Sequence, residues 1–81
     1  MTEKEFILMA ADATGHDPAG IGMNDLLVAD TGFNSLSLLL FFLKVENATG
    51  KKYLPFPYVN LHEMRLKDLW KIVCEQGENK T

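Results

Sequence analysis

The sequence predicts an all-α fold of three main helices and one short helix, with a long first loop. Apolar residues recur at helical spacing in three separate stretches, and glycine or proline separates these stretches. No stretch alternates polar and apolar residues as a half-buried strand would. At 81 residues the chain is long enough for one modest core, so we expect residues 1–81 to form a single domain.

The first helix should begin directly after Thr2. Thr2 and Glu5 have the spacing of a capping box, in which each side chain accepts a hydrogen bond from the backbone of the other residue. Apolar residues then recur at helical spacing over about three turns: Phe6, Met9, Ala10 and Ala13. The segment from Gly15 to Gly22 holds three glycines and one proline, which end the helix and predict a long, mobile connection.

The second helix should run from Ser35 to Thr49. Either Asn34 or Ser35 can cap its first amides, and Gly50 suits the left-handed residue that often ends a helix. A helix of that length would span roughly 22 Å.

Two further segments complete the predicted fold. Pro55 and Pro57 exclude regular structure around Phe56, and a short helix is expected across Tyr58–Met64. A last amphipathic helix is marked by apolar residues at helical spacing: Leu66, Leu69, Trp70 and Val73. Residues 76–81 are polar and should form a frayed tail.

The second helix carries two apolar stripes on roughly opposite sides. One stripe consists of Leu38, Phe41, Phe42 and Val45. The other, named here the leucine face, consists of Leu36, Leu39, Leu40 and Leu43. A helix of so small a domain can hardly be buried on every side, so one stripe should be exposed or contact a partner. The alternative is that the leucine face is additional core.

Composition and charge argue against several classes of protein. The formal net charge is −3, and no clustered basic surface suggests nucleic-acid binding. The longest apolar run, Leu36–Phe42 with Ser37 inside it, is much shorter than the roughly 20 residues of a membrane span. The first residues lack the layout of a secretion signal, and Cys74 is a single cysteine, so we expect a cytoplasmic protein. We also expect a monomer.

The sequence offers no recognisable catalytic or metal-binding constellation. Ser35 lacks the glycines of a nucleophile elbow, because Phe33 and Ser37 occupy those positions. His16 and His62 have no recognisable setting as general bases, and we interpret them as ordinary loop or surface histidines. No two histidines or cysteines share ligand spacing, so no metal site is expected.

Ser35 lies where the second helix should begin. A hydroxyl there faces unsatisfied amides and the positive end of the helix dipole, so an attached phosphate would be well placed. Gly32-Phe33-Asn34-Ser35-Leu36 resembles the Gly-x-Asp-Ser-Leu motif of acyl and peptidyl carrier proteins. The resemblance extends over most of the chain through three later features: Gly50 at the family's distance from the serine, Leu54-Pro55, and Leu66-Lys67-Asp68-Leu69.

The resemblance implies a four-helix bundle of the acyl carrier type. Ser35 would carry a covalent 4′-phosphopantetheine arm, added by a phosphopantetheinyl transferase, with Gly32, Asn34 and Leu36 as the surrounding motif. The arm would hold an acyl or aminoacyl group as a thioester. The protein would then be a non-catalytic carrier that delivers intermediates to partner enzymes, in polyketide, nonribosomal peptide or specialised lipid synthesis.

Two departures from the family pattern bear on recognition. Asn34 replaces the family's aspartate and keeps its shape and capping ability without its negative charge. Ser37, Leu40 and Asn47 occupy positions where the family usually places acidic residues that meet partners. Electrostatic steering should therefore be weak, and partners should have apolar docking surfaces. The residues expected to contact partners are the apolar Leu36, Leu40 and Leu43, together with Ser37 and Asn47.

The remaining large side chains are interpreted as packing. Phe6 and Trp70 should anchor the terminal helices, and Cys74 should be a small apolar contact. Met23 and Met64 should pack in the same way, with a cavity for an acyl chain as the alternative. A second hypothesis for function is an unmodified helical interaction module of the same fold, which binds a partner through the leucine face.

Overall fold

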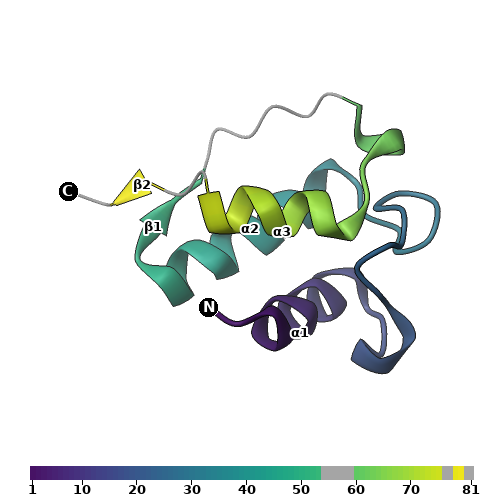
Figure 1. Cartoon of the computed structure of the whole chain (residues 1–81), viewed down its shortest axis with the longest axis horizontal. Helices are drawn as coiled ribbons and strands as arrows, with labels where there is room; N and C mark the ends of the chain where they lie inside the picture. Colours follow the sequence, from purple (N-terminus) through teal and green to yellow (C-terminus); the bar gives the residue numbers. More distant parts are fainter. Residues whose placement is uncertain (54–59, 76–77, 80–81) are drawn as a thin grey trace.

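A computed structural model describes residues 1–53, 60–75 and 78–79, and these residues are mostly helical, as predicted (Figure 1). The helices are α1 (Glu3–Thr14), α2 (Ser35–Thr49) and α3 (Leu66–Glu75), with short 3-10 helices η1 (Pro18–Gly20) and η2 (Leu61–Glu63). None of the helices in these ranges is long and apolar enough to cross a membrane.

Local capping sets the ends of α1. The amide of Thr2 donates to the Glu5 carboxylate over 2.9 Å, and the amide of Glu5 donates to the Thr2 hydroxyl over 3.1 Å. These hydrogen bonds to Thr2, backbone first, lower the pKa of Glu5. Gly15 ends the helix in the left-handed conformation, with φ of 73°. The predicted capping box and break are both confirmed.

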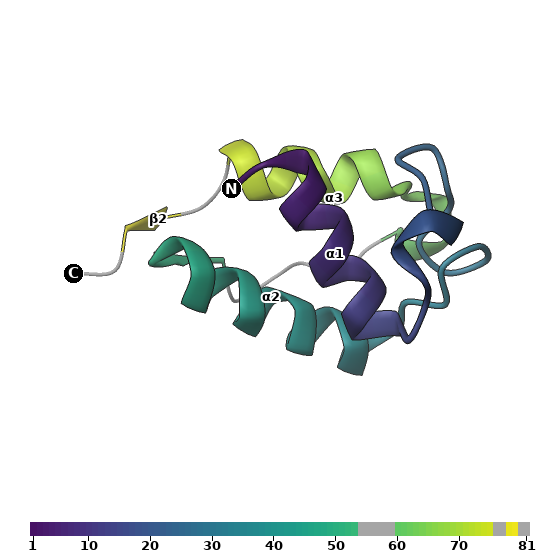
Figure 2. The same cartoon turned by 90° about the horizontal axis from the view of Figure 1, so that it is seen from below.

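α2 and α3 run in the same direction, and α1 crosses them (Figure 2). The core between the helices contains Phe6 of α1, residues of α3 and one of the two apolar stripes of α2. The α3 residues are Leu66, Leu69 and Val73, and the stripe is Leu38, Phe41, Phe42 and Val45. Aromatic rings connect these elements: the Phe6 ring lies 5.6 Å from that of Phe41 and 5.1 Å from that of Trp70. The expected anchoring roles of Phe6 and Trp70 are therefore confirmed.

The connection between α1 and α2 is long, as expected, and backbone hydrogen bonds hold its second half against the start of α3. The amide of Leu27 donates to the carbonyl of Met64 over 2.9 Å, and the amide of Leu66 donates to the carbonyl of Asp25 over 2.8 Å. Leu27 is fully buried. These hydrogen bonds anchor the part of the connection that follows the glycine-rich segment 15–22, and the mobility expected of that segment stays a prediction.

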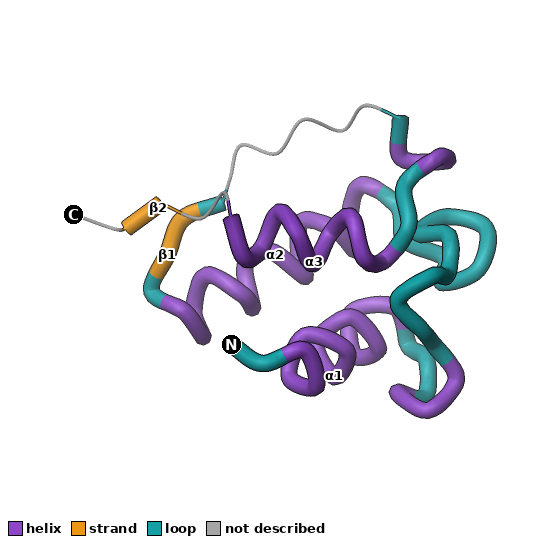
Figure 3. The backbone as a smooth tube through the Cα atoms, viewed as in Figure 1, coloured by secondary structure: helices purple, strands orange, loops and turns teal. Residues whose placement is uncertain are grey.

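Two short strands were not predicted. β1 (Lys51–Lys52) and β2 (Glu78–Asn79) pair in antiparallel register, Lys51 with Asn79 and Lys52 with Glu78 (Figure 3). Strands of two residues are too short to show an alternating pattern, so periodicity does not reveal them. Part of the tail that we expected to be frayed is thus paired.

The predicted short helix corresponds to η2, which is a single 3-10 turn. Residues 58–59 of its predicted range lie outside the described residues, as does Leu54-Pro55 of the family resemblance. The predicted last helix is confirmed as α3, whose Leu66, Leu69 and Val73 are buried.

Candidate functional site

The start of α2 is fixed by a capping box between Asn34 and Ser37. The Asn34 side-chain oxygen accepts a hydrogen bond from the Ser37 amide over 2.9 Å, and the Ser37 hydroxyl accepts one from the Asn34 amide over 2.8 Å. Asn34 is thus the residue that caps the helix, one of the two predicted alternatives. Ser37, which we expected to contact partners, has its hydroxyl occupied by this box.

Ser35 is the first residue of α2 and its side chain is exposed. Because Asn34 and Ser37 form the cap, the Ser35 hydroxyl is left outside the capping box. In an α-helix each amide donates to the carbonyl four residues earlier. For the amides of Ser35 and Leu36 that carbonyl lies before the start of α2, so neither has an acceptor within the helix. An exposed hydroxyl therefore lies beside amide donors at the positive end of the helix dipole, which fits a covalently attached phosphate.

Phe33 attaches this segment to the core. It is buried, its ring lies 5.8 Å from that of Phe41, and its amide donates to the carbonyl of Leu27 over 2.8 Å. Gly32, directly before it, is exposed and has a φ of 75°, a conformation that side chains disfavour. Phe33 is therefore the one residue of the motif that is buried, whereas Asn34, Ser35 and Leu36 are exposed at the surface.

The leucine face of α2 is exposed. Its exposed fractions are 65% for Leu36, 38% for Leu39, 46% for Leu40 and 43% for Leu43. The opposite stripe is fully buried: Leu38, Phe41, Phe42 and Val45. The alternative that the leucine face is additional core is therefore wrong, because α1 and α3 both pack against the opposite side.

This face also lacks exposed acidic residues. Of the charged side chains on α2, Lys44 forms an ion pair with Asp12 over 2.7 Å, and Glu46 is buried. Asn47, at one of the family's acidic positions, is exposed. A partner that approaches the leucine face would thus meet apolar and neutral groups, beside the exposed Lys44–Asp12 ion pair and with Ser35 at one end.

Three side-chain hydrogen bonds near this helix, two of them buried, were not predicted from the sequence. Glu46 accepts a hydrogen bond from the Tyr53 amide over 2.8 Å, and the Tyr53 hydroxyl donates to the carbonyl of Val73 over 2.7 Å. Burial raises the pKa of Tyr53. At the other end of α2, the ring of His16 contacts the carbonyl of Thr31. The pairs are 7, 20 and 15 residues apart, and no local pattern indicates them.

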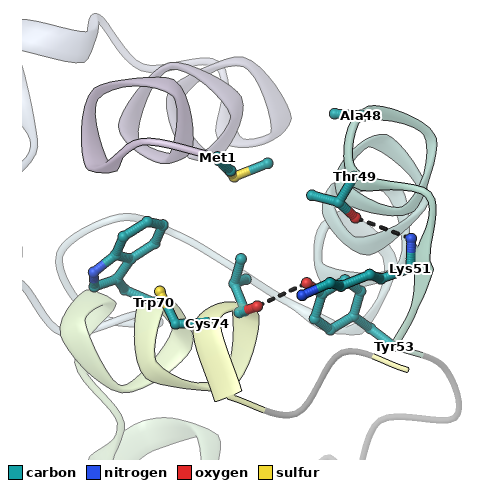
Figure 4. Close-up of a pocket in the computed structure, with 8 residues that line it drawn as sticks. Met1, Ala48, Thr49, Lys51, Tyr53, Trp70 and Cys74 are labelled. Carbon is teal, nitrogen blue, oxygen red and sulfur yellow. Dashed lines mark hydrogen bonds between the residues drawn. The ribbon is translucent and has the colours of Figure 1, made fainter. Parts of the chain in front are cut away.

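A hollow of about 410 Å³ lies at the other end of α2 from Ser35 (Figure 4). Its lining includes Thr49, Tyr53, Trp70 and Cys74. The Thr49 and Tyr53 hydroxyls donate to carbonyls of the protein itself, and Lys51 also belongs to the lining. Cys74 is exposed here, which corrects the expectation that it packs as an apolar contact.

Met23 and Met64 are partly buried and pack against the core, as the packing interpretation expected. Within the described ranges, no cluster of three or more histidine, cysteine, aspartate or glutamate side chains could hold a metal ion.

Comparison of the chain with protein-family models, with curated proteins and with solved structures found no match. We therefore infer the function from the residues themselves and from their arrangement around Ser35.

Proposed function

We propose that this protein is a carrier that holds acyl or aminoacyl intermediates as thioesters on a 4′-phosphopantetheine arm attached to Ser35. The observation that carries the proposal is the position of Ser35. Its exposed side chain begins α2, outside the capping box, at one end of an exposed apolar helix face. A modified serine in that position would present its cargo beside a surface on which a partner can dock.

The modification requires a simple displacement. The Ser35 oxygen forms a bond to the phosphorus next to pantetheine in coenzyme A, and the pyrophosphate bond breaks. Adenosine 3′,5′-bisphosphate leaves, and the hydroxyl proton passes to a base of the transferase. The amides of Ser35 and Leu36 at the helix start favour the phosphodiester that results.

The arrangement of helices supports the finer assignment to a four-helix bundle of the carrier type. α1, α2 and α3 would be the main helices, and η2 would take the place of the short third helix. The long connection leads to the modified serine, and Gly50 ends α2 with a φ of 71°. The protein itself would be non-catalytic.

The leucine face defines the partners that this carrier would serve. Without exposed acidic residues on α2, electrostatic attraction contributes little, and binding depends on burying leucine side chains. We therefore propose loading and downstream enzymes with apolar docking surfaces. In transfer of the cargo to a cognate partner enzyme, Leu40→Glu should raise KM for the carrier because it puts a charge on this apolar face, and an unchanged KM would contradict the docking role.

The decisive experiment is incubation with coenzyme A and a promiscuous phosphopantetheinyl transferase, followed by intact-mass measurement. The wild type should gain the mass of one phosphopantetheinyl group. Ser35→Ala should gain nothing. The matched variant Ser37→Ala removes a neighbouring hydroxyl but keeps Ser35, so it should still gain this mass. Absence of the gain with several transferases would overturn the proposal.

The exposed leucine face also favours a second candidate, an unmodified interaction module of the same fold. In that case the face would bind a partner without any arm on Ser35. Ser35→Ala would then leave partner binding unchanged, while Leu40→Glu would abolish it.

A further inference from the structure

One long-range contact joins the end of α1 to the segment that leads into Ser35. The Nε2 atom of His16 lies 2.8 Å from the carbonyl oxygen of Thr31, 15 residues further along the chain. A carbonyl oxygen accepts hydrogen bonds and does not donate them, so the imidazole must be the donor through its Nε2–H.

The backbone of His16 is itself held in place. Its amide donates to the carbonyl of Ala11 over 2.9 Å, in the turn that closes α1 after Gly15. Ala11 is buried. The imidazole therefore projects from a fixed point on the core, although the residue itself is exposed.

The amide, the hydroxyl and the carbonyl of Thr31 all form hydrogen bonds. The residue is fully buried; its amide donates to the carbonyl of Leu26, and its hydroxyl donates to the carbonyl of Leu27. His16 provides a donor for the remaining carbonyl. Without that donor, the Thr31 carbonyl would lose its hydrogen bond to the end of α1, which favours local opening of the segment.

The backbone immediately after Thr31 is the backbone of the proposed attachment site. The amide of Gly32 donates to the carbonyl of Val28 over 3.1 Å, and Phe33 then enters the core before Asn34 caps α2. An opening at Thr31 would therefore disturb the residues that flank Ser35.

We propose that His16 is a positioning residue that keeps the Gly32–Ser35 segment in the shape that the modifying enzyme binds. This inference rests on the proposed carrier function. When a binding-competent shape is only partly populated, apparent affinity falls by that fraction, while chemistry in the bound complex is unchanged. Loss of His16 should thus raise KM for the carrier and leave kcat nearly constant.

The test compares His16→Ala, His16→Gln and wild type in the transferase reaction with coenzyme A. One lost hydrogen bond shifts the opening equilibrium about fivefold to tenfold, and His16→Ala should raise KM by up to that factor. His16→Gln should restore most of the loss, because its side-chain amide can also donate. His62→Ala, a change at an exposed histidine of η2, is the matched control and should behave as wild type.

Hydrogen exchange of the Gly32 and Phe33 amides provides a second measurement that does not need the transferase. His16→Ala should speed their exchange by a similar factor, and His16→Gln should not. Unchanged exchange in His16→Ala overturns the inference, and so does faster exchange with an unchanged KM. If the wild type is not modified, the proposed function fails, and exchange alone decides whether His16 holds this segment.

Discussion

The carboxylate of Glu46 accepts a hydrogen bond from the backbone amide of Tyr53 over 2.8 Å, inside the protein. Glu46 is on the last turns of α2, and the hydroxyl of Tyr53 donates to the carbonyl of Val73 on α3. This pair therefore connects the C-terminal ends of two helices that are separated by a long stretch of sequence.

Removing the Glu46 acceptor should destabilise the protein. Glu46→Ala leaves the buried Tyr53 amide unpaired, and we expect a loss of about 2 kcal/mol in the free energy of unfolding. Glu46→Gln keeps a side-chain oxygen and should lose less. Urea denaturation measures both values, and equal stability of Glu46→Ala and wild type would contradict the role of this link.

Tyr53 should make stability fall at alkaline pH. Burial raises its pKa in the folded state above the ordinary value of 10.0, so the unfolded chain loses this proton first. The contribution of Tyr53 is fully present below pH 10.0 and is lost as pH rises through the higher folded pKa. Tyr53→Phe should be less stable at neutral pH, because it lacks the hydrogen bond to Val73, and its stability should fall less steeply above pH 10.0. Parallel curves of unfolding free energy against pH would contradict this assignment.

The two faces of α2 should respond differently to substitution. Leu38→Ala creates a cavity in the core and should cost about 3 kcal/mol. Leu40→Ala changes a residue that is exposed and should alter stability by less than about 0.5 kcal/mol. Both variants replace leucine by alanine in the same helix, so the change in helix propensity is the same in both. Thermal unfolding compares them, and a similar loss in both would show that the leucine face is covered.

Two substitutions of Asn34 distinguish the effect of helix capping from the effect of a negative charge at this position. Asn34→Asp keeps the side-chain acceptor and adds a negative charge at the helix start, so stability should be equal or slightly higher. Asn34→Ala removes the acceptor for the Ser37 amide and should cost about 1 kcal/mol. If the carboxylate assists general transferases, Asn34→Asp should also be modified faster than wild type. Equal rates would show that the neutral cap suffices.

The helix boundaries could be predicted because capping is local. Thr2 and Glu5 are three residues apart, as are Asn34 and Ser37, and Gly15 and Gly50 end their helices in left-handed conformations. The same local rules left a choice open at α2, where either Asn34 or Ser35 could have been the cap. The structure assigns it to Asn34, which is what leaves the Ser35 hydroxyl outside the capping box.

The contacts that shape the candidate site could not be predicted in this way. His16 and Thr31, or Tyr53 and Val73, become neighbours when helices pack, and their side chains carry no periodic signal in the sequence. The inward position of Phe33 depends likewise on where Phe41 lies in the core.

By itself, the sequence determined which residues of α2 share a face, because 3.6 residues per turn divide its apolar side chains into two stripes. It did not determine which stripe is buried, since both are apolar and of similar size. The tertiary structure decided that: α1 and α3 pack against Leu38, Phe41, Phe42 and Val45, and the leucine face is left exposed beside Ser35. Burial of one face is a property of how three helices pack together, and no single helix carries that information.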